Sequence, residues 1–154
     1  ASLRHVVAAF SDVPNAAFVW APTTWTGPAG RRIGAWWPGD DAVDWVGLDA
    51  YPQSAAASYL LHGPDGMDDV AAFAGAHHKP LMLTEWAPDL PHPDTAAAVN
   101  LVLDWAATHP VVQALVYFDF VAGGKDYTLV HHPVGAAALR RRVAHDPRYL
   151  TNVH

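Results

Sequence analysis

An α/β fold with a parallel sheet is the fold class that this sequence of 154 residues predicts. Four short apolar runs have the β-branched and aromatic content of buried parallel strands, and helical patterns lie between them. Because strands and helices alternate along the chain, right-handed crossovers should join the strands side by side. The chain is long enough for one core, so we expect residues 1–154 to form one domain.

The four predicted strands show little alternation of polar and apolar residues, which is typical of buried parallel strands. Each run is five or six residues long and ends in polar or aromatic residues. Since ligands meet the carboxyl ends of the strands in parallel α/β folds, these end residues are candidates for a site. The strands are expected at residues 17–21, 45–49, 81–85 and 114–119.

Four helices are predicted around these strands. Residues 68–78 follow the turn formers Pro64–Gly66 and end just before Pro80. The next helix opens at Pro93 and stops at Pro110, with apolar residues at the spacing of one helical face. The remaining helices are expected at residues 3–13 and 133–144.

The connection at residues 22–41 is long for a link between a strand and the next element. It contains four Gly, three Pro and three Trp, among them Trp36 and Trp37. Long connections without regular structure are usually functional or mobile. We therefore count this segment among the candidate functional regions.

Composition excludes several classes of function. The chain is 51% hydrophobic and 16% charged, which is too apolar for disorder, and its net charge of −6 argues against nucleic-acid and anionic membrane partners. No stretch approaches the roughly 20 apolar residues of a membrane-spanning helix. The sequence has no cysteine and no histidine spacing typical of a metal site, so we expect no metal and no cofactor.

Glu85 stands out as the single glutamate among 15 acidic residues. It closes the apolar run Pro80–Leu83, where an unpartnered carboxylate would be costly to desolvate. A chemical function is therefore the favoured interpretation for Glu85. For the other acids and rings at strand ends, capping of helices and packing in the core remain equal alternatives.

Acidic and aromatic residues gather at the predicted carboxyl ends of the strands. Aromatic faces flanked by carboxylates suit a sugar, because a ring stacks on the C–H face of a pyranose while acids reach its hydroxyl groups and its glycosidic carbon. The sequence therefore favours a carbohydrate ligand. The residues at these ends are Trp20, Asp49, Tyr51, Glu85, Trp86, Phe118, Asp119 and Phe120.

The segment 36–51, Trp-Trp-Pro-Gly-Asp-Asp-Ala-Val-Asp-Trp-Val-Gly-Leu-Asp-Ala-Tyr, resembles a motif of glycoside hydrolase family 26, best known for endo-β-1,4-mannanases. Lys79–Glu85 is similar to the seventh strand of that family, which ends in the nucleophilic glutamate. Residues 15–22 resemble its fifth strand, 114–120 its eighth and 135–149 its final helix. The resemblance covers nearly the whole chain.

The resemblance implies the carboxyl-terminal half of a (β/α)8 TIM barrel, strands five to eight with their helices. It makes Glu85 the nucleophile, Tyr51 the tyrosine that hydrogen-bonds this nucleophile, and Asp49 a supporting acid. It places Trp86 and Phe118 near the reacting sugar. The family commonly has tryptophan at the position of Phe118 and a smaller residue at that of Trp86.

The expected function is that of a retaining glycoside hydrolase on β-linked polysaccharide, endo-β-1,4-mannanase-like and, by resemblance, extracellular. The chain would carry the nucleophile half of the active site, because the family places its acid/base glutamate on strand four. We therefore expect the isolated chain to be inactive. The alternative is an incomplete half-barrel that binds sugar through Trp20, Trp36, Trp37 and Trp86, or that self-associates through its open strand edges.

Overall fold

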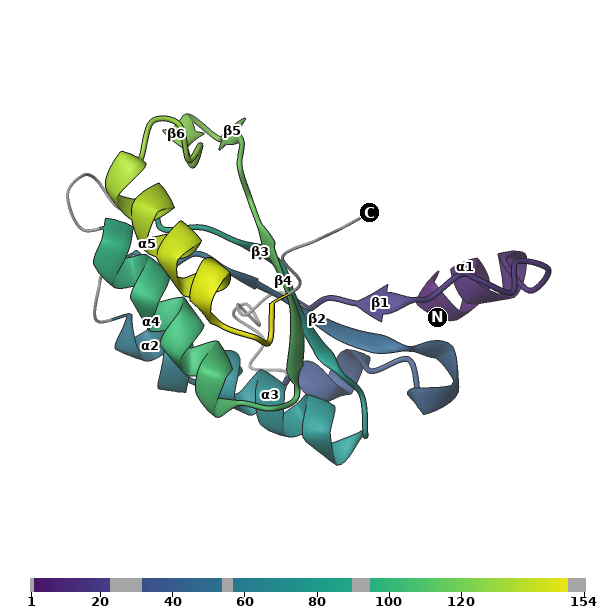
Figure 1. Cartoon of the computed structure of the whole chain (residues 1–154). Helices are drawn as coiled ribbons and strands as arrows, with labels where there is room; N and C mark the ends of the chain where they lie inside the picture. Colours follow the sequence, from purple (N-terminus) through teal and green to yellow (C-terminus); the bar gives the residue numbers. More distant parts are fainter. Residues whose placement is uncertain (1, 23–31, 54–56, 90–94, 150–154) are drawn as a thin grey trace. The chain divides into compact units, whose positions relative to one another are not determined.

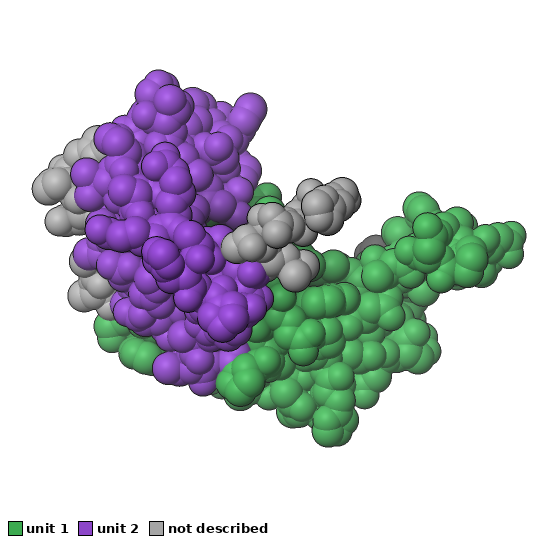
Figure 2. Space-filling view, viewed as in Figure 1, with its two compact units in different colours: residues 1–50, 58–86, 110–116 green, residues 51–57, 87–109, 117–154 purple. Residues whose placement is uncertain are grey.

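The computed structural model describes residues 2–22, 32–53, 57–89 and 95–149 (Figure 1). The chain divides into two compact units (Figure 2). Unit 1 comprises the described residues of 1–50, 58–86 and 110–116, and unit 2 those of 51–57, 87–109 and 117–154. Helices and strands alternate along the described chain around a parallel sheet, so the chain belongs to the α/β class.

A four-stranded sheet with the order β1-β2-β3-β4 forms the centre of unit 1. The strands are β1 (Val19–Trp20), β2 (Trp45–Ala50), β3 (Leu81–Trp86) and β4 (Val112–Tyr117), and β2 pairs in parallel with both β1 and β3. β4 lies two residues earlier than predicted, because its hydrogen bonding to β3 begins where Leu81 N donates to Val111 O (2.8 Å). The expectation of strands five to eight of a TIM barrel stays a prediction.

One face of this sheet is the core of unit 1. Side chains alternate along β2, and every second residue from Val46 to Ala50 is fully buried. In β3, Leu81 and Leu83 are buried in the same way, and the register pairs Leu83 with Leu48. Helix α3 (Met67–Ala76) packs against β2 and contributes further buried apolar side chains.

The helices of unit 1 are shorter than the sequence predicts. α1 (Ser2–Ala9) ends before residues 10–12, which form turns, and α3 ends at Ala76, with His77 as its C-cap. α2 (Ser58–His62) was not predicted, because its five residues are too few for a periodic pattern. Within the connection predicted at 22–41, η1 (Ile33–Trp36) and η2 (Asp40–Ala42) are 3₁₀ helices, while residues 23–31 lie outside the described residues.

Unit 2 is built on two helices that pack along each other, α4 (Thr95–Thr108) and α5 (Pro133–His145). Gly135 allows their close approach, because a methyl group at this position would lie 3.1 Å from the side chain of Thr95. A hairpin of β5 (Val121–Ala122) and β6 (Lys125–Asp126) turns at Gly123 and Gly124. Both glycines have positive φ, as a tight hairpin turn requires.

In the part of the chain that the structure describes, no helix has the length and apolar character needed to cross a membrane.

Candidate active site

A β-bulge shapes the carboxyl ends of β2 and β3. Leu48 pairs with Leu83 but Asp49 pairs with Glu85, so Thr84 is an extra residue in β3. In a regular strand without the bulge, Glu85 would follow Leu81 and Leu83 onto the buried face of the sheet. The bulge moves Glu85 to the face that carries Asp49, and Trp86 takes the next buried position.

The Asp49 carboxylate lies among polar groups of β3. Thr84 Oγ1 donates a hydrogen bond to Asp49 Oδ1 (2.7 Å), and the backbone N–H of Glu85 also donates to this carboxylate. Burial raises the pKa of Asp49, the negative charge of Glu85 raises it further, and the two hydrogen bonds oppose this rise. The net effect is a raised pKa, which is typical of acids gathered at a functional site.

Gly47 leaves room for this arrangement. A methyl group at Gly47 would lie 2.6 Å from Ala21 Cβ and 2.9 Å from both Val19 Cγ1 and Thr84 Cγ2. The methyl group of Thr84 therefore lies over the position of a missing side chain, while its hydroxyl group faces Asp49. Neither Gly47 nor Thr84 was among the predicted site residues, although Thr84, a polar residue next to Glu85 in an apolar strand, was a usable signal.

Trp86 was predicted to contact the sugar, but its side chain lies in the core. Its side chain is 1% exposed, and it pairs with Ala50 on the buried face of the sheet. The residue that follows the bulge continues the core, so this indole has no surface free for stacking on a sugar. Trp86 is therefore a core residue of unit 1.

Trp20 and Trp37 also pack within unit 1. Trp20 pairs with Val46, so it lies on the opposite face of the sheet from Asp49. Its ring centroid is 4.9 Å from that of Trp37, and both rings contact Phe73 of α3. This packing accounts for both residues, and of the predicted sugar-binding tryptophans Trp36 has the most open side chain, at 46% exposed.

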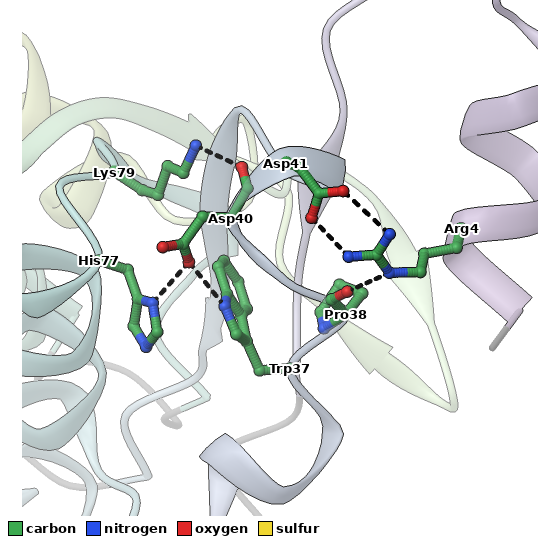
Figure 3. Close-up of polar contacts among 7 residues, drawn as sticks. All are labelled: Arg4, Trp37, Pro38, Asp40, Asp41, His77 and Lys79. Carbon is green, nitrogen blue, oxygen red and sulfur yellow. Dashed lines mark hydrogen bonds and ion pairs between the residues drawn. The ribbon is translucent and has the colours of Figure 1, made fainter.

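A second pair of acids in unit 1 is surrounded by basic groups (Figure 3). Asp40 Oδ1 accepts hydrogen bonds from Trp37 Nε1 (2.9 Å) and His77 Nδ1 (2.7 Å), and Lys79 Nζ donates to the backbone carbonyl of Asp40 (2.8 Å). Arg4 Nη1 donates to Asp41 Oδ2 (3.0 Å). The bond from His77 lowers the pKa of Asp40.

These bonds give the two acids a structural function. Arg4 also lowers the pKa of Asp41 and donates to the backbone carbonyl of Pro38. Together the contacts fasten residues 37–41 to α1 and to the end of α3. Residues 37–41, at the start of the segment that carries the family resemblance, thus have a structural function.

Unit 2 brings the remaining predicted aromatic residues together. The ring of Phe118 lies within 6.2 Å, centroid to centroid, of the rings of Tyr51, Phe120 and Tyr127. Asp119 accepts a hydrogen bond from the backbone N–H of Leu129 (2.7 Å), so this predicted acid holds a loop. Phe120 is 64% exposed and presents the most open ring of this cluster.

Burial raises the pKa of Tyr117 to about 12, and the neighbouring Asp119 adds to this effect. Tyr117 is therefore protonated at neutral pH, and its hydroxyl group donates to the backbone carbonyl of Tyr127 (3.2 Å).

Within residues 2–22, 32–53, 57–89 and 95–149, no three histidine, aspartate or glutamate side chains are placed to hold a metal ion.

Fold and site thus define an α/β protein in which two carboxylates meet at neighbouring ends of parallel strands. The chain is 35% identical over 91 residues to the β-1,3-xylanase TXYA of a Vibrio species, and 35% identical over 75 residues to a β-1,3-xylanase of an Alcaligenes species. The matches cover 56% and 48% of this chain but 18% and 14% of the relatives. No family model matches the chain. The similarity points to glycoside hydrolases, and assignment to family 26 stays a prediction.

Proposed function

We propose that this chain is part of a retaining glycoside hydrolase that cleaves a β-linked polysaccharide, with Glu85 as its nucleophile. The observation that carries the proposal is the pairing of Asp49 with Glu85 on one face of the sheet, produced by the bulge at Thr84. The similarity to two β-1,3-xylanases supports the class of enzyme. It also makes β-1,3-xylan the first substrate to test, ahead of the β-mannan that the family 26 resemblance implies.

In a retaining mechanism, a carboxylate attacks the anomeric carbon while the bond to the leaving oxygen breaks, and a second carboxyl group about 5–5.5 Å away protonates that oxygen. Glu85 would form the new carbon–oxygen bond. Water would then cleave this glycosyl-enzyme and restore the carboxylate.

Asp49 is poorly placed for the acid step in this proposal. Its carboxylate already accepts hydrogen bonds from the Thr84 hydroxyl group and the backbone N–H of Glu85. A group that is held as an acceptor is not set up to release a proton to a leaving group. We therefore assign the acid step to a glutamate outside this chain, which itself contains one glutamate.

Aromatic rings would bind the sugar. In unit 1, Trp36 has the exposed surface that stacking requires. Tyr51 and Phe118, which lie in the same ring cluster as Phe120, remain proposed contacts of the substrate.

The test is the rate of β-1,3-xylan hydrolysis by the complete protein that carries this chain, with Glu85→Gln beside the wild type. We expect Glu85→Gln to lower kcat by about six orders of magnitude, as loss of the nucleophile does in a serine hydrolase. Asp104→Asn is the matched control, because Asp104 is an exposed acid of α4 that pairs with Arg142. It should change kcat by less than about twofold. Hydrolysis at the wild-type rate by Glu85→Gln would overturn the proposal.

A further inference from the structure

We propose that Thr84 is a positioning residue that, in the space left open by Gly47, keeps Asp49 ionised and thereby fixes the backbone that carries Glu85. The part of this inference that concerns catalysis rests on the proposed function. The part that concerns Asp49 does not depend on the proposed function.

The first step is the orientation of Thr84. Its Cγ2 would lie 2.9 Å from a methyl group at Gly47, so the absence of that side chain lets the methyl group of Thr84 settle there. The hydroxyl group then faces β2, and its oxygen lies 2.7 Å from Asp49 Oδ1. Threonine is stiff about its first side-chain torsion, so this packing also fixes the direction of the hydroxyl group.

The second step is the charge of Asp49. Among the described residues, the charged group that faces it is Glu85, which lies opposite in the register and disfavours a second negative charge. Burial acts in the same direction. Thr84 Oγ1 and the backbone N–H of Glu85 are the donors that favour the ionised form.

The third step links Asp49 to Glu85. An ionised Asp49 accepts a bond from the backbone N–H of Glu85, and this bond ties the end of β3 to β2 just after the bulge. Protonation of Asp49 weakens the bond, because a neutral carboxyl group is a poorer acceptor than a carboxylate. The hold of Asp49 on the backbone of Glu85 therefore weakens as the pH falls through the pKa of Asp49.

The experiment is an NMR titration of the Asp49 carboxyl carbon in the 154-residue chain. Thr84→Val removes the hydroxyl group with little change of shape, and we expect it to raise the pKa of Asp49 by about one unit. Thr84→Ser restores a hydroxyl group and should return the pKa to within about 0.3 units of the wild type. If the valine variant does not fold, Thr84→Ala removes the same hydroxyl group without adding bulk.

The matched control is Thr128→Val, because the Thr128 hydroxyl group donates to another carboxylate, that of Asp126. It should leave the titration of Asp49 unchanged. An unchanged pKa of Asp49 in the variants of Thr84 that lack the hydroxyl group, or an equal rise in Thr84→Ser, would overturn the proposal. This titration uses no substrate, so its result is independent of whether Glu85 is catalytic.

The link to Glu85 is tested separately in the complete protein. The acidic limb of kcat/KM should move to higher pH in Thr84→Val by the same shift as the titration, and stay in place in Thr84→Ser. A shifted titration with an unmoved acidic limb would refute the link between Asp49 and Glu85. If Glu85→Gln hydrolyses normally, the proposed function fails while the titration still decides the function of Thr84.

Discussion

Asp40 and Asp49 are two aspartates of unit 1 whose surroundings shift their pKa values in opposite directions. Asp40 is exposed and bonded to His77 and Trp37, and these bonds lower its pKa. Asp49 is half-buried, bonded to a hydroxyl group and a backbone N–H, and faces a second carboxylate. Burial and that second carboxylate raise its pKa.

The difference separates a structural acid from a functional candidate. The ionised form of an exposed acid beside basic groups is stabilised in the folded state, so its presence is explained by the fold. The ionised form of an acid that folding brings close to another acid is destabilised in the folded state. The presence of such an acid therefore needs another explanation. The position of Asp49 opposite Glu85 supplies one, the proposed catalytic site.

The largest expected effect on stability comes from filling the space beside Asp49. Gly47→Ala places a methyl group 2.6 Å from Ala21 Cβ and 2.9 Å from two further side chains of neighbouring residues, so we expect a loss of about 1–3 kcal/mol in the free energy of unfolding. Gly75→Ala is the control, because nothing lies within 4 Å of its added methyl group. As an exposed alanine in α3 it should stabilise by about 0.5–1 kcal/mol. Urea unfolding measures both, and equal effects would contradict the packing described around Gly47.

Glu85→Gln is predicted to have a smaller effect on stability and to stabilise the chain, whereas most substitutions destabilise a protein. Loss of the Glu85 charge lowers the pKa of Asp49 toward its usual range, so the folded state no longer holds two neighbouring charges at neutral pH. We expect the unfolding temperature of the chain at pH 7 to rise by roughly 1–3 °C.

The matched variant for that measurement is Asp40→Asn, which should lower the unfolding temperature at pH 7. The folded-state pKa of Asp40 is lowered, so its stabilisation is complete above the ordinary aspartate pKa and disappears as the pH falls through the folded value. The Glu85→Gln difference should therefore shrink as the pH falls through the raised pKa of Asp49, and the Asp40→Asn difference only at lower pH, below the ordinary aspartate pKa of about 3.9. If the unfolding temperatures of Glu85→Gln and Asp40→Asn shift in the same direction at pH 7, the distinction between the surroundings of Asp49 and those of Asp40 is contradicted.

Much of the fold was predictable because buried parallel strands leave unbroken apolar runs. The predicted strands at 45–49 and 81–85 match β2 and β3 to within one residue. α2 was missed because it is too short for a periodic signal, and the β5–β6 hairpin has strands of two residues. Gly123 and Gly124 did carry a hairpin signal, since glycine pairs suit such turns.

The candidate site was predictable in its residues but not in its geometry. Asp49 and Glu85 could be placed at neighbouring strand ends, and the register pairs them. The bulge at Thr84 could not be predicted, because it arises from the pairing of two strands that are distant in the sequence. That extra residue places Glu85 beside Asp49 and sends Trp86 into the core, contrary to the expectation for Trp86.

The most direct test of Glu85 as the nucleophile is covalent labelling of the complete protein. A xyloside with an activated leaving group and fluorine beside the anomeric carbon forms the glycosyl-enzyme faster than water removes it, so the intermediate accumulates for peptide mass spectrometry. We predict one added sugar on the peptide that contains Glu85 and none in Glu85→Gln. A label on another residue, with Glu85 unmodified in an enzyme that still hydrolyses xylan, would contradict the assignment.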